Sequence, residues 1–172
     1  DGDGKPDLAV ANENITTVSI LKNRSTVGTI SLTTDVTLTG LSNPLEVAIG
    51  DFDGDSKPDL AVSNYGGNTV SFFRNSNTVS GTMSFTPTAS LTFTTDTFPY
   101  GLSIGDVDGD GKIDLAVTNY NSSTLSVLKN SSAVNALSFT RVNYPTGASP
   151  YGVVVGDMNA DGKPDIAVAN NG

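Results

Sequence analysis

Short runs rich in valine, isoleucine, phenylalanine and threonine follow one another along the whole chain, and stretches of glycine, asparagine, aspartate and proline separate them. Residues of the first group favour strands, whereas those of the second group favour turns. No segment shows apolar residues at the spacing typical of one face of an α-helix. The pattern predicts an all-β protein made of many short strands.

One phrase of sequence occurs four times, and each copy joins an Asp-rich loop to a short apolar run. The copies are DGDGKPDLAVAN (1–12), DFDGDSKPDLAVSN (51–64), DVDGDGKIDLAVTN (106–119) and DMNADGKPDIAVAN (157–170). Their last aspartates, Asp7, Asp59, Asp114 and Asp165, are 52, 55 and 51 residues apart. The chain is therefore a tandem array of similar units.

Each unit contains up to four strand-like runs in phase with this phrase. A run that ends in glycine precedes the Asp-rich loop, the LAV or IAV run leaves it, and two more runs follow. The first runs are EVAIG (46–50), LSIG (102–105) and VVVG (153–156). The third runs are TVSILKN (17–23), TVSFFRN (69–75) and TLSVLKN (124–130), and the fourth are ISLTTDVTL (30–38), MSFTPTASLTF (83–93) and LSFTRVNY (137–144).

Four antiparallel strands in a unit of this length are typical of a β-propeller blade, whereas the competing β-solenoid usually has a shorter period. We expect one repeat array: a first blade at 1–44 that lacks its first strand, blades at 45–98 and 99–149, and the start of a fourth at 150–172. Closed propellers use about four to eight blades. We therefore expect the chain to form part of a larger propeller or of an assembly.

The amino-acid composition excludes some classes of functional site and argues against others. The chain has no cysteine and no histidine, which excludes disulfides, thiolate or histidine metal sites and a Ser-His-Asp triad. Its net charge of −9 argues against nucleic acid, because phosphates are bound by clustered lysine and arginine. No apolar run approaches the roughly 18 residues of a membrane span. We expect neither a nucleic-acid partner nor a span.

The Asp-rich phrase places carboxylates at loop positions 1, 3, 5 and 9. Such carboxylates converge on one point and repel one another unless a cation lies between them. Ca²⁺ suits them because it accepts about six to eight oxygen ligands in flexible geometry. In the third copy the predicted ligands are Asp106, Asp108, Asp110, Asp114 and the carbonyl oxygen of Lys112, with Gly111 at the sharp turn.

The other copies give equivalent ligand sets. The second offers Asp51, Asp53, Asp55, Asp59 and the carbonyl of Lys57; the fourth offers Asp157, Asn159, Asp161, Asp165 and the carbonyl of Lys163; the first offers Asp1, Asp3, Asp7 and the carbonyl of Lys5. We expect the third copy to bind most tightly. Ser56 replaces the turn glycine in the second copy, Asn159 removes one charge from the fourth, and the first copy lacks position 1.

Acidic Asx turns without a metal are the alternative interpretation of these loops. An EF-hand is excluded, because its position 12 needs a glutamate and here holds Val62, Val117 or Val168. Fourteen of the 18 acidic residues lie in the four loops, so four Ca²⁺ ions would reduce the net charge to about −1. The acidity thus indicates a metal requirement rather than a basic partner.

The phrase DxDGDGKxDLAVxN, preceded by an apolar strand that ends in Gly-Asp, resembles the FG-GAP/VCBS-type repeat. This family forms calcium-binding blades of integrin α-subunit propellers and of many bacterial surface proteins. The resemblance spans nearly the whole chain. It implies calcium ligation by the residues named above and an extracellular or cell-surface location.

Tyrosines are expected at the end of the blades opposite the Asp-rich loops, where amphipathic aromatic residues often serve recognition. Tyr65 and Tyr120 lie in turns, and Tyr100 and Tyr151 occur in PYG before the first strand of a unit. They are candidate partner-binding residues. The alternative is that they pack between blades, above all Tyr100 and Tyr151.

The leading hypothesis is a non-enzymatic, calcium-binding, extracellular propeller module for adhesion, recognition or surface assembly, with a protein or carbohydrate partner of unknown identity. One alternative is the propeller portion of a polysaccharide-active, lyase-like enzyme, although no histidine or cysteine is present to assist. Another is a structural subunit that self-assembles through exposed blade edges.

Overall fold

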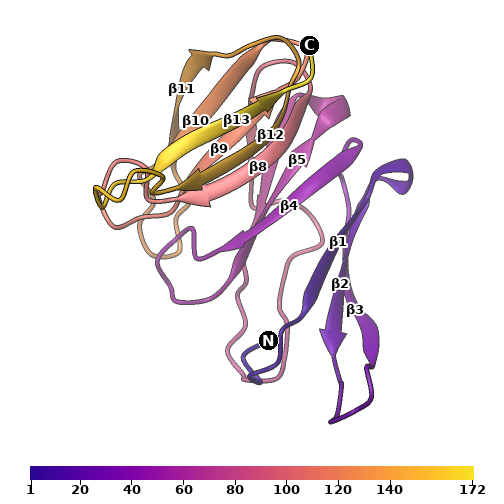
Figure 1. Ribbon diagram of the computed structural model, residues 1–172. Helices are drawn as coiled ribbons and strands as arrows, with labels where there is room; N and C mark the ends of the chain where they lie inside the picture. The colour runs from indigo at the N-terminus through magenta and orange to yellow at the C-terminus, as the bar shows by residue number, and fades with distance from the viewer.

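Thirteen strands form four separate antiparallel sheets in the computed structural model, which describes residues 1–172 (Figure 1). Strands follow one another in chain order within each sheet, so every connection is a hairpin. The first sheet comprises β1 (Leu8–Asn12), β2 (Thr17–Asn23) and β3 (Leu32–Leu38). The second comprises β4 (Pro44–Gly50), β5 (Asp59–Asn64), β6 (Thr69–Phe73) and β7 (Leu91–Thr94).

The two remaining sheets repeat this plan. The third comprises β8 (Pro99–Gly105), β9 (Asp114–Asn119), β10 (Thr124–Asn130) and β11 (Phe139–Pro145), and the fourth has β12 (Pro150–Gly156) and β13 (Asp165–Asn170). Figure 1 shows β12 and β13 stacked on the third sheet, with the first sheet at the opposite side of the molecule. The all-β prediction is confirmed; the only helical segments are two 3₁₀ turns, η1 (Glu13–Ile15) and η2 (Tyr65–Gly67).

The hydrophobic core lies between neighbouring sheets rather than inside any one of them. Phe52 and Phe72 of the second unit pack with Leu115 and Phe139 of the third in the largest cluster of buried residues. A second cluster joins the first two sheets, and a third joins β9 and β10 to the fourth sheet. Every residue of β5 and of β9 is buried, because these strands are covered on both faces. Each sheet therefore depends on its neighbours, as blades of a propeller do.

A repeated asparagine fixes the register of the second hairpin in each unit. Asn64 ends β5, and its side-chain Nδ2 donates hydrogen bonds to Thr69 Oγ1 at 3.0 Å and Ser71 Oγ at 2.8 Å on β6. Asn119 and Asn12 make the same pair of bonds in their own units. A slip of one residue would break both bonds and turn the buried faces outward.

The fourth strand of the second unit differs from its prediction. A run was expected over residues 83–93, but β7 begins only at Leu91, and a single bridge from Asn75 to Phe85 remains of the earlier part. Pro87 explains the difference, since proline has no N–H for a ladder. Its carbonyl oxygen instead accepts the N–H of Thr39, 2.7 Å away in the first unit.

Candidate metal centre

The first aspartate of the second, third and fourth loops shapes the turn through its own carboxylate. In the third loop, Asp106 Oδ1 accepts the N–H groups of Gly109 at 2.8 Å and Asp110 at 3.0 Å, while its Oδ2 accepts Gly111 N–H at 2.8 Å. Asp51 makes equivalent bonds in the second loop. In the fourth loop, Asp157 accepts the N–H groups of Asp161 and Gly162. These hydrogen bonds close the backbone into a tight turn. Positions 3 and 5 both lie within that turn.

The last aspartate of the second loop and that of the third loop each tie three segments together from a buried position. Asp114 is 1% exposed; its Oδ2 accepts Val107 N–H at 2.9 Å and its Oδ1 accepts Asn130 N–H at 2.8 Å. Asp59 bonds to Phe52 and Asn75 in the same way. This carboxylate therefore links the start of the loop, the strand that leaves it and the end of the following strand.

The pKa of Asp59 is raised to about 6, mainly by burial and also by the negative charges of Asp53 and Asp55. The hydrogen bonds from Asn75 and Phe52 act in the opposite direction. The ionised carboxylate is thus held in surroundings that disfavour its charge. A cation placed among these acids would reverse that preference.

Carboxylates from positions 1, 3 and 9 come together in two of the four loops. One oxygen each of Asp51, Asp53 and Asp59 lie within 4.8 Å of one another, and so do oxygens of Asp106, Asp108 and Asp114. Oxygen ligands about 2.4 Å from a central ion can be at most about 4.8 Å apart. The spacing and the all-oxygen chemistry therefore fit Ca²⁺, with a carboxylate already buried beside it.

The remaining predicted ligands are arranged differently. The position 5 carboxylates do not belong to these groups: Asp55 accepts the N–H and the Nζ of Lys57, both at 3.0 Å, and Asp110 accepts Lys112 N–H at 3.0 Å. The first and fourth loops form no group of three carboxylates; the first lacks position 1, and Asn159 stands at position 3 of the fourth. Ligation by the carbonyls of Lys5, Lys57, Lys112 and Lys163 stays a prediction.

Ser56 adopts the left-handed backbone that the sequence suggested for its position, with φ at +66°, whereas Gly111 and Gly162 occupy the same place in their loops. A residue with a side chain is strained there by about 1–2 kcal/mol. We expect Ser56→Gly to raise the free energy of unfolding by about 1 kcal/mol. Urea denaturation measures the change.

The reciprocal variant Gly111→Ser is the matched control for Ser56→Gly. A Cβ at Gly111 meets no atom within 4 Å, so only the φ of +85° opposes it. We expect this variant to lose a similar amount of stability. Equal stability of both variants and the native chain would contradict strain at this turn.

Two residues outside the loops belong to the site, and we did not predict either of them. Asn75 lies two residues after β6, and Asn130 is the last residue of β10. Each donates its backbone N–H to the last aspartate of its loop, Asp59 or Asp114. The residue before each asparagine is basic and contacts the position 3 carboxylate. The sequence does contain a pattern that could have identified these residues. A basic residue followed by asparagine recurs at the same place in three units, as LKN, FRN and LKN at Lys22, Arg74 and Lys129.

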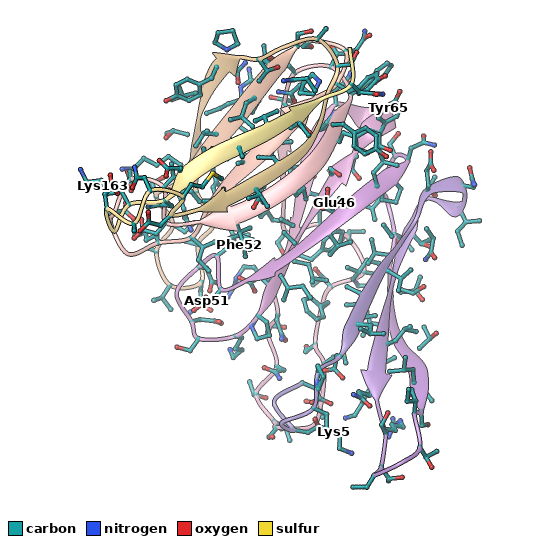
Figure 2. All side chains as sticks on the ribbon, in the orientation of Figure 1. Lys5, Glu46, Asp51, Phe52, Tyr65 and Lys163 are labelled. Atoms are coloured by element: carbon teal, nitrogen blue, oxygen red, sulfur yellow. The ribbon has the colours of Figure 1, made fainter.

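The four candidate tyrosines gather at the other end of the strands (Figure 2), where Tyr65 lies far from Asp51 and Lys163. The ring centroid of Tyr100 lies 6.2 Å from that of Tyr65, 6.2 Å from that of Tyr120 and 4.1 Å from that of Tyr151. Tyr100 donates its hydroxyl to that of Tyr151 at 2.8 Å, which raises the pKa of Tyr100 to about 12. Tyr100 therefore packs against the next unit, and partner binding by these tyrosines stays a prediction.

A family model described as an FG-GAP-like repeat matches the chain three times, at residues 1–62, 51–117 and 106–168. The chain belongs to the FG-GAP repeat family. Each match begins at one Asp-rich loop and ends in the strand that leaves the next loop, so consecutive FG-GAP repeats share a loop. The resemblance seen in the sequence is thereby confirmed.

The FG-GAP repeats are also similar to a solved structure, the crystal structure of BBS1N in complex with ARL6DN, soaked with lead. The TM-score is 0.58 at 18% identity, over 98% of this chain and 47% of that chain, so the repeats span about half of its length. The likeness supports the β-propeller fold, although the four sheets do not close into a ring. No curated protein sequence matches the chain. None of its helical segments is long and apolar enough to cross a membrane.

Proposed function

We propose that these FG-GAP repeats form a calcium-binding, non-catalytic module of an extracellular or cell-surface β-propeller that serves adhesion, recognition or surface assembly. The convergence of three carboxylates in each of two loops, with Asp59 and Asp114 buried, carries the proposal. Unneutralised carboxylates at such spacing repel one another. In these two units calcium would bind positions 1 and 3 of the loop together with the position 9 aspartate, which also bonds to the asparagine after the basic residue, and would thereby stiffen the blade. The tyrosine end of the blades is then free for a protein or carbohydrate partner.

An extracellular location agrees with this use of calcium. Sites of modest affinity fill at the millimolar calcium concentrations found outside cells. A ligand present at about 100 times its dissociation constant adds about 2.7 kcal/mol to the free energy of unfolding for each site. Two filled sites would therefore add a large fraction of the stability of an ordinary domain.

The test combines a count of bound ions with thermal unfolding. After dialysis against calcium we expect elemental analysis to find two to four calcium ions per chain, matching the two complete and two variant loops. The unfolding temperature should fall by at least about 10 °C in chelator, since 1 kcal/mol corresponds to about 2–4 °C at this chain length. Magnesium at equal ionic strength is the control, because it demands a smaller octahedral site. No bound calcium and an unchanged unfolding temperature would overturn the proposal.

A further inference from the structure

In each of the first three units, a basic side chain from outside the Asp-rich loop contacts an aspartate of that loop. Lys22 Nζ is 2.5 Å from Asp1 Oδ2, and Arg74 Nε is 2.5 Å from Asp53 Oδ2. Lys129 Nζ forms an ion pair with Asp108 Oδ2. The three acids share position 3 of their loops, and the three bases share one place in the third strand region of their units.

The hairpin register produces this contact. Leu8 is opposite Leu21, Leu60 opposite Phe73, and Leu115 opposite Leu128. The next residue in each case is the basic one, which therefore stands beside the end of the loop. The asparagine that follows it is anchored by its N–H to the position 9 aspartate, so the base cannot move far from the loop.

Each complete loop presents a second carboxylate to the same base. Arg74 is 3.8 Å from Asp55, and Lys129 Nζ is 3.6 Å from Asp110 Oδ2. The base thus contacts positions 3 and 5, both of which are predicted calcium ligands. An oxygen that accepts a short N–H bond has fewer lone pairs for a metal, and a positive charge next to the site repels Ca²⁺.

We propose that Lys22, Arg74 and Lys129 are internal counter-cations that neutralise the loops in the absence of metal and compete with calcium for the position 3 carboxylate. They hold the metal-free loop in shape and set the calcium concentration at which each loop fills. This inference rests on the proposed calcium function. It adds the basic residue that regulates the calcium affinity of each of the three loops.

Two of the three bases also reach the following unit. Lys22 Nζ donates to the carbonyl of Gly81, and Arg74 Nη2 donates to Asn135 Oδ1. Lys129 makes no such contact, and its side chain is 46% exposed. Substitution of Lys129 therefore tests competition with calcium without disturbing the packing between units.

The experiment is a calcium titration followed by NMR at the amide of Gly111, which bonds to Asp106 inside the third loop. We expect Lys129→Gln to lower the half-saturating calcium concentration at Gly111 about fivefold to tenfold. Lys129→Arg should stay within about twofold of the native chain, because it keeps the charge. Arg141→Gln is the control for net charge; Arg141 pairs with Asp96, away from the loops, and its loss should change the concentration less than twofold.

A second readout uses the metal-free protein. In chelator, Lys129→Gln should melt at a lower temperature than the charge-conserving Lys129→Arg, since Asp108 and Asp110 lose their only basic partner. Unchanged or weaker calcium binding in Lys129→Gln would overturn the counter-cation while leaving the calcium function intact. A native chain whose Gly111 amide does not respond to calcium would overturn both.

Discussion

Replacing Asp114 with alanine is expected to lower the free energy of unfolding of the metal-free protein by about 2–5 kcal/mol. The carboxylate accepts the N–H groups of Val107 and Asn130 and is 1% exposed. Alanine offers no acceptor, and each buried N–H left without a partner costs about 1–3 kcal/mol. Urea denaturation in chelator measures this structural role separately from any effect of calcium.

Two matched variants serve as controls for Asp114→Ala. Asp35→Ala removes an exposed carboxylate on β3 and should change stability by less than about 0.5 kcal/mol. Asp114→Asn keeps one side-chain oxygen as an acceptor but loses the charge, so it should be more stable than Asp114→Ala in chelator and gain less from calcium. If Asp114→Ala were as stable as Asp35→Ala, position 9 would not link the three segments.

The second large effect is expected at the interface between the second and third units. Phe72 is fully buried; its ring stacks on Phe139 with centroids 4.4 Å apart and meets Phe52 edge-on at 5.4 Å. Phe139 begins β11, whereas Phe52 and Phe72 belong to the second unit. Phe72→Ala would leave a cavity between two sheets and should destabilise the protein by about 3–5 kcal/mol.

Denaturation of three variants tests this interface. Phe72→Leu keeps most of the side-chain volume, so the change in packing should lower the free energy of unfolding by less than about 1.5 kcal/mol. Loss of the aromatic contacts should lower it by a further amount of about 0.5–1.5 kcal/mol. Val142→Ala, on the exposed face of β11, should change stability by less than about 0.5 kcal/mol. A loss below about 1 kcal/mol in Phe72→Ala would contradict a core shared by the two units.

The in-phase phrases predicted where most strands lie, because burial on both faces requires the same apolar runs in each unit. The first strands nevertheless begin earlier than expected, at Pro44, Pro99 and Pro150. Each is irregularly paired just after its proline, so its first residues show no regular apolar pattern. Pro87 shortened β7 in a run whose composition otherwise favours a strand.

The loop sequence predicted the site only in part. Positions 1, 3 and 9 do converge in two loops, but position 5 lies outside both groups, since Asp55 and Asp110 bond to the backbone two residues ahead. Local spacing gives the ligand types without giving the direction of each side chain. That direction depends on hydrogen bonds within the turn.

The sequence by itself determined the repeat, the all-β class, the Asp-rich loops and the strained turn at Ser56, because each depends on neighbours along the chain. Only the tertiary structure decided which distant residues meet. Lys129 reaches Asp108 through the pairing of β9 with β10, and Tyr100 meets Tyr151 through the packing of consecutive units. Such contacts follow from strand register and sheet stacking, which bring together groups separated by about 20 to 50 residues.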